Sequence, residues 1–328
     1  MKTLSTLRLL VFAGMLFAFF SCTKNNAVNE PRLALPDAGS FQDLRNEALK
    51  DLVQTKTFKA EDGVEFTSAK GVKLQIWGDC LQDQEGNAVT GDVTLSFVEM
   101  YDRGNMLVTN KPLMGINANG KKEPLVTGGQ FNIEVKQGNK ILKPGCLFSM
   151  QVPAGLTGGL DHDMSLWTGS FNENGDLAWE EVQEGNGKER PLNPNEQQTS
   201  YGIFGQEFGW NNVDRFSSYT GPKTQIKVTV PAAYNQTNSG VFLAYEDSPY
   251  TLAQLDSYDT AEKYFTEHYG FVPVGLTVHV IFTSESNGQI VYAIKQVTIT
   301  SGSIIAINES DLNTTTKENL VSMINALH

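Results

Sequence analysis

Apolar and polar residues alternate with a period of two in several short stretches between residues 58 and 190, as they do in strands with one buried face. Three of these stretches are 72–76, 93–97 and 131–135. Clusters of Gly, Asn and Pro separate them at short intervals, which is typical of turns. The pattern predicts a first antiparallel β-sandwich domain over 58–190.

A second β-rich region follows over 200–328. Residues 241–245 are a continuous apolar run typical of a central strand, and 276–282 and 291–299 flank a Ser-Asn-Gly-Gln turn that favours a hairpin. We therefore expect a second β-sandwich domain here. The predicted fold is mainly β, with two antiparallel Ig-like sandwiches and a short helix at each end of the chain.

Helical spacing of apolar residues appears near both ends of the mature chain. It predicts a short amphipathic helix over 40–54, at the end of a tether that occupies 22–57. A second helix is predicted over 260–268, and a third over 315–327 would close the structure. Residues 183–199 are rich in Glu, Gly, Asn, Gln and Pro, which predicts a linker between the two domains.

Residues 1–21 have a different character from the rest of the chain. Lys2 and Arg8 precede a short apolar run, which is shorter than the ~20 residues that span a bilayer. Charge, apolar core and small residue in that order predict a signal peptide. The run ends with two phenylalanines, Ser21 and Cys22, and this ending resembles the lipobox of bacterial lipoproteins in the Phe-rich form typical of Bacteroidota.

The lipobox resemblance implies cleavage before Cys22 and attachment of acyl chains such as palmitate to its thiol. Several acyl chains on one residue give stable anchoring, whereas one chain is marginal. The resemblance thus implies an outer-membrane lipoprotein of a bacterial cell envelope, with the membrane as partner and either the periplasmic or the surface face occupied. The alternative is an ordinary secretory signal followed by an incidental cysteine.

Two further cysteines, Cys80 and Cys146, remain in the mature chain. Export permits a disulfide between them, and two buried free thiols are the open alternative. Without nearby histidines they do not indicate a zinc site. Removing residues 1–21 leaves 37 acidic and 23 basic side chains, a net charge of −14, which excludes the basic footprint of a nucleic-acid partner.

Candidate chemistry is sparse. Asp161, His162 and Asp163 are a weak candidate for binding a hard cation, with a solvated loop as the alternative. No phosphate-binding loop, nucleophile elbow or zinc motif occurs, so we predict no cofactor. Thr260 follows an Asp and precedes an Ala, a short pattern that is used for O-glycosylation in Bacteroidota.

Two stretches resemble modules of Bacteroidota surface and secreted proteins with tandem β-sandwich domains. One is 86–99, continuing to Gly128 and Gly129, and the other is 208–216. The resemblance implies a lipoprotein family of uncharacterised role and carries over no catalytic residue. Within 208–216, Trp210, Asp214 and Arg215 are weak ligand candidates, and a structural role with the aromatic rings in the core is the alternative.

These observations predict a lipid-anchored cell-envelope protein with a non-enzymatic binding or scaffolding role and an unidentified ligand. One alternative is a surface glycan-binding module associated with polysaccharide uptake, with a glycan or an envelope protein as partner. Another is a carbohydrate-active hydrolase, which needs two carboxylates facing each other across a cleft. Trp77 and Trp167 lie in predicted strands, and we expect both in the core.

Overall fold

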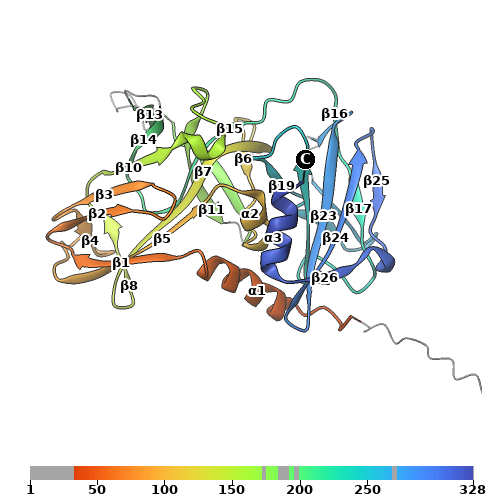
Figure 1. The fold of residues 1–328 in the computed structure, drawn as a ribbon, viewed down its shortest axis with the longest axis horizontal. Coiled ribbons are helices and arrows are strands. Elements are labelled where there is room, and N and C mark those ends of the chain that lie inside the picture. The colour runs from red at the N-terminus through yellow and green to blue at the C-terminus, as the bar shows by residue number, and fades with distance from the viewer. Residues whose placement is uncertain (1–32, 172–174, 184–191, 196–198, 268–271, 328) are drawn as a thin grey trace, which may run out of the picture. The chain divides into compact units, whose positions relative to one another are not determined.

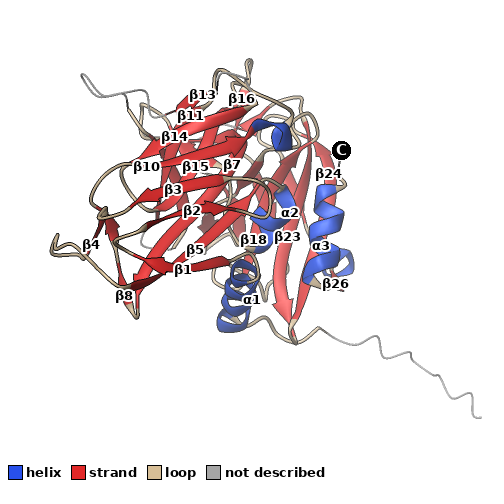
Figure 2. Ribbon diagram, turned by 60° about the vertical axis from the view of Figure 1, so that its left-hand side comes forward, coloured by secondary structure: helices blue, strands red, loops and turns tan. Residues whose placement is uncertain are grey.

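The structure is a computed structural model that describes residues 33–171, 175–183, 192–195, 199–267 and 272–327. Strands dominate the described residues, so the prediction of a mainly β fold is confirmed (Figure 2). Contacts gather residues 34–328 into one unit, which we call the body.

Helices occur near both ends of the body, as predicted, and once between them. The described α-helices are α1 (Ala38–Lys50), α2 (Arg103–Val108) and α3 (Lys317–Asn325). Helix α1 begins earlier than expected because the carboxylate of Asp37 accepts the N–H of Ser40 at 2.7 Å and caps its first turn. Helix α2 was not predicted, since its six residues are too few to display a helical period.

The largest sheet has eight strands and is called the β7 sheet. Its strands are β1 (Gln54–Lys59), β5 (Asp92–Met100), β7 (Lys122–Gln137), β15 (Gly209–Phe216), β11 (Ser165–Phe171), β12 (Leu177–Glu181) and β6 (Met114–Ile116) in that order, with β8 (Lys140–Ile141) paired to β7. Because β6 also pairs with β7, the strands β7, β15, β11, β12 and β6 form a closed ring of neighbours.

A five-stranded sheet, called the β10 sheet, shares a core with the β7 sheet. Its strands are β13 (Leu192–Pro194), β14 (Ser200–Gly205), β10 (Phe148–Pro153), β3 (Lys73–Trp77) and β2 (Gly63–Thr67). Leu74 and Ile76 of β3 meet Phe97 of β5 and Phe131 and Ile133 of β7 in one buried cluster. Side chains of the opposite parity on β3 therefore face away from this core.

The last third of the chain forms further sheets. One has the order β19 (Leu252–Gln254), β18 (Ser239–Tyr245), β23 (Thr277–Ser286), β24 (Gln289–Thr298) and β26 (Asn313–Thr315), and another has β20 (Ser257–Asp259), β21 (Tyr264–Thr266), β17 (Lys227–Thr229) and β25 (Ile304–Ala306). Two-stranded pairs are β16 (Lys223–Thr224) with β22 (Val272–Pro273) and β4 (Leu81–Gln82) with β9 (Lys143–Pro144). Short 3₁₀ helices are η1 (Ala154–Thr157) and η2 (Glu309–Asp311). The predicted β23–β24 hairpin and the buried strand β18 are confirmed.

The helix predicted over 260–268 is wrong for the residues that the structure describes. Residues 260–263 are a turn between β20 and β21. The carboxylate of Asp259 accepts the N–H groups of Ala261 and Glu262, and Lys263 closes the turn with a φ of 57°. These local hydrogen bonds compete with a helical turn.

The sheets cross the stretch predicted as a linker. Residues 192–194, within 183–199, form β13 and pair with β14. Strand β14 pairs with β10, and β15 pairs with β7 and β11. Residues 200–216 therefore complete the sheets of the preceding region.

The two regions meet around α2 and α3, which lie side by side between them (Figure 1). Arg103, which is only 2% exposed, donates hydrogen bonds to the carbonyl oxygens of Tyr245 and Leu327. The backbone N–H of Gly104 donates to the side-chain oxygen of Asn325 at 2.8 Å. A second buried cluster spans this junction and contains side chains from both regions, among them Met106 and Leu320.

Candidate functional site

The structure brings the two predicted polar clusters together. Nε of Arg215, on β15, donates to Oδ2 of Asp161 at 2.7 Å, and the other carboxylate oxygen accepts the N–H of Asp163. Burial raises the pKa of Asp161, but the hydrogen bonds from Arg215 and Asp163 together outweigh it and hold the pKa below its usual value. Arg215 thus forms an ion pair with the carboxylate of Asp161, which was a candidate metal ligand.

The other members of the 161–163 cluster point to solvent. His162 and Asp163 are exposed, and the N–H of Asp161 is fixed by the hydroxyl of Tyr201 at 2.7 Å. Among the described residues, no three His, Cys, Asp or Glu side chains lie close enough together to hold a metal ion.

Asp214 is buried inside the β7 sheet. Its Oδ2 accepts a hydrogen bond from Asn212 at 2.6 Å, while its Oδ1 has no hydrogen-bond partner in the described structure. Burial raises the pKa of Asp214 well above its usual value. Its backbone oxygen accepts the indole N–H of Trp167 at 2.9 Å, so this residue acts inside the core, away from any ligand.

The tryptophans divide between the core and the surface. Trp210 packs edge-to-face on Trp179, and Trp167 is 1% exposed, as expected for the core. The expectation for Trp77 is wrong, because its side chain is 43% exposed. Leu74 and Ile76 take the inward positions on β3, which leaves Trp77 on the outer face.

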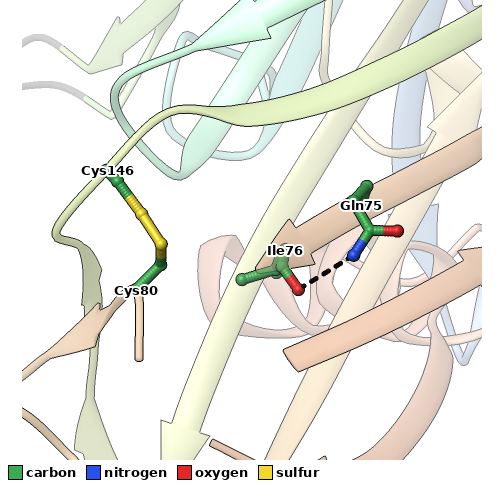
Figure 3. Close-up of a disulfide and its surroundings, with 4 residues drawn as sticks. All are labelled: Gln75, Ile76, Cys80 and Cys146. Atoms are coloured by element: carbon green, nitrogen blue, oxygen red, sulfur yellow. Dashed lines mark hydrogen bonds between the residues drawn. A yellow bond between two sulfur atoms is a disulfide. The ribbon is translucent and has the colours of Figure 1, made fainter. Parts of the chain in front are cut away.

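Cys80 and Cys146 are joined in a disulfide (Figure 3). It adjoins the β4–β9 pair, in which Leu81 faces Pro144, and the N–H of Gly145 donates to the oxygen of Cys80 at 2.7 Å. The disulfide therefore braces the ribbon formed by β4 and β9.

Of the two residues predicted to be modified, Thr260 and Cys22, the structure describes only Thr260. Thr260 is exposed in the β20–β21 turn, so a glycan there would meet no steric obstacle from burial, and its glycosylation stays a prediction. Cys22 lies outside the described residues.

A cleft of about 540 Å³ opens beside β7 and was not predicted. Strand β15 begins at Gly209, opposite Ile133, and β8 pairs with β7 from Lys136 onward. Lys136 pairs with β5 on its other side, so β15 and β8 lie along the same edge of β7. Glu134 lies in the gap between these two pairings, where the cleft is formed.

The lining of the cleft contains both polar and apolar side chains. Asn132 and Glu134 line it from β7, Lys143 from β9, and Gln206 and Glu207 from the β14–β15 loop. Apolar surface comes from Ile141, Leu142, Pro144 and Phe208. A cleft of this size is typical of small-molecule binding.

The outer face of the β10 sheet carries a separate group of exposed side chains. Leu147 precedes Phe148, whose partner in the last β10–β14 pair is Gly205. Three apolar side chains are exposed on this face: Trp77 at 43%, Leu147 at 41% and Phe204 at 37%.

A second pocket, of about 260 Å³, lies beneath α1 against α2, α3 and β24. Its walls include Phe41, Ala48 and Leu320 from the helices. An ion pair between Lys317 and Asp51 closes part of its rim. Its apolar walls belong to the packing of the helices.

No protein family matches the chain, and no curated protein is significantly similar to it.

In the described part of the chain, no helix combines the length and apolar character needed to cross a membrane. The cleft residues come from β7, β9 and the β14–β15 loop and carry no local motif. Only the alternation of Asn132 and Glu134 with core positions on β7 could have marked these two as surface residues.

Proposed function

We propose that the chain is an exported, lipid-anchored protein of a bacterial cell envelope whose body binds or scaffolds rather than catalyses. Two observations support export. Residues 1–22 have the layout of a lipoprotein signal, and Cys80 and Cys146 form a disulfide, as is common in oxidising compartments. The disulfide carries the proposal because it comes from the fold and is independent of the N-terminal pattern.

The roles of the candidate residues support binding over catalysis. Asp161 and Arg215 hold a loop against β15, and Asp214 and Trp210 are packed in the core. Among the described residues, the cleft offers polar and apolar side chains that can contact a ligand, as loops and sheet faces of rigid scaffolds often do.

The finer architecture is part of the proposal. We assign the first region to an antiparallel sandwich, supported by the core that the β7 and β10 sheets share. Two Ig-like domains remain our proposal for the body as a whole.

Metabolic labelling with radioactive palmitate tests the anchor. We expect label in the wild-type chain and its loss in Cys22→Ala, because the substitution removes the thiol that carries the lipid. The double variant Cys80→Ala/Cys146→Ala is the matched control and should retain the label. Label that persists in Cys22→Ala would overturn the anchor.

A glycan-binding module is the second candidate function, and the exposed Trp77 and Phe204 specifically favour it. A carbohydrate-active hydrolase is tested in the same experiments, because release of reducing ends from a bound polysaccharide would contradict the non-enzymatic role.

A further inference from the structure

We propose that the cleft beside β7 binds an uncharged saccharide chain. The proposal names the ligand class for the binding role above and rests on it.

The cleft offers side-chain amides that the protein does not use. In the described structure, the amides of Asn132 and Gln206 make no side-chain hydrogen bond, although Asn132 is half-buried. An amide donates and accepts at once, which matches a sugar hydroxyl that does the same. Glu207, on the same loop as Gln206, adds carboxylate oxygens that accept from hydroxyls.

The charge of the cleft suits a neutral ligand. Glu134 pairs with Lys136 at 2.6 Å, so its charge is compensated. Lys143 and Glu207 then add one positive and one negative charge to the lining of the cleft. An anionic chain would meet two carboxylates there and a body of strongly negative net charge, which disfavours its binding.

Apolar side chains line part of the cleft. Inside the cleft, Phe208 is held by a ring contact with Phe148 at 5.6 Å between centroids, which fixes its orientation. Sugar rings have one apolar C–H face, and rigid side chains such as these pack against it at a low entropic cost.

The cleft wall is rigid on the side of the β4–β9 ribbon. Pro144 lines the cleft, pairs with Leu81, and precedes Cys146 by two residues. Cys146 is joined to Cys80 in the disulfide (Figure 3). A preformed wall means that little ordering is required when a chain binds.

Affinity electrophoresis of the full chain tests the proposal. The native gels contain soluble starch, xylan, galactomannan or mixed-linkage β-glucan, and a chondroitin sulfate gel serves as the anionic comparison. We expect at least one neutral polysaccharide to retard the wild-type chain. The double variant Asn132→Ala/Gln206→Ala should raise the dissociation constant for that polysaccharide at least ~10-fold, since two hydrogen-bonding groups are lost.

The matched control is Gln183→Ala, which removes an exposed amide outside the cleft and should leave retardation unchanged. Thermal unfolding of each variant checks its fold, and the exposed Glu207→Gln is a second probe if the double variant unfolds early. Absence of retardation in every neutral gel, retardation only by chondroitin sulfate, or equal retardation of wild type and cleft variants would overturn the site.

Failure of the site and failure of the proposed function are distinguishable. A chain that takes up palmitate at Cys22 but is retarded by no neutral polysaccharide overturns the saccharide site and leaves the anchor standing. A chain that binds polysaccharide without taking up label overturns the anchor and leaves the site standing.

Discussion

Asp214 is an acidic residue that the fold keeps from solvent. It is fully buried, its Oδ1 has no partner in the described structure, and burial raises its pKa well above the usual value. A group whose pKa is higher in the folded state stabilises the fold below its unfolded pKa, near 3.9, and this contribution is lost as pH rises through the folded pKa.

We therefore predict that Asp214→Asn weakens the pH dependence of stability. As the pH rises from 5 to 8, the free energy of unfolding of wild type should fall more than that of the variant, because asparagine cannot ionise. Urea unfolding at both pH values measures this. An identical difference between the two proteins at both pH values would contradict the prediction.

Asp161 and Arg215 show how much of the candidate site the sequence predicts. Both residues were singled out, but as members of two separate clusters. Their ion pair depends on β15 lying beside β11 in the β7 sheet, a pairing between strands far apart in the chain. Alternation along β3 likewise predicts that the side chains of Trp77 and Ile76 lie on opposite faces of the strand. Which of the two faces is buried depends on the partner sheet.

At the scale of elements, the close packing of α2 against α3 depends on a glycine, Gly104. A methyl group added at Gly104 would lie 2.5 Å from the backbone oxygen of Val321 on α3, which is closer than real contacts allow. Only a residue without Cβ therefore permits the two helices to approach this closely.

We predict that Gly104→Ala lowers the free energy of unfolding by about 1–3 kcal/mol, as overpacked sites do. Gly155→Ala is the control, because a methyl group there meets no atom within 4 Å and its backbone has no left-handed conformation. Thermal unfolding midpoints compare the two variants. Equal midpoints would mean that α2 and α3 separate without cost.

Elements defined by local pattern were predicted well. Strands β3, β5 and β23 and the β23–β24 hairpin follow directly from alternation and turn residues. The helix predicted over 260–268 is wrong at 260–263, because the carboxylate of Asp259 accepts the N–H groups of Ala261 and Glu262 and holds these residues in a turn. Which strands pair was beyond the pattern, since residues 200–216 reach back to partners that precede the predicted linker.

At the scale of the whole molecule, the two regions share hydrogen bonds and a core. The N–H of Leu113 donates to the oxygen of Leu252, and the N–H of Thr127 donates to the oxygen of Tyr250. Lys122 and Asp256 form an ion pair at 2.5 Å whose side chains are mostly buried. Shared burial of this kind couples the unfolding of both regions.

We predict one cooperative unfolding transition for the body. All four tryptophans precede residue 217, whereas Leu320 lies on α3 and is fully buried. Leu320→Ala should cost about 2–5 kcal/mol and shift the midpoint followed by tryptophan fluorescence as much as the midpoint followed by circular dichroism. A shift in circular dichroism without a matching shift in fluorescence would show that the regions unfold independently.

The described chain enters the body at Ala34, whose N–H donates to the hydroxyl of Ser286 at the end of β23, and α1 follows directly. In a protein tethered through Cys22, tension would therefore act first on one hydrogen bond and then along a helix that can unwind turn by turn. Extending the 13 residues of α1 from helical to extended rise releases about 25 Å of chain. Under mechanical load, α1 would thus unfold and lengthen before the force reached the sheets.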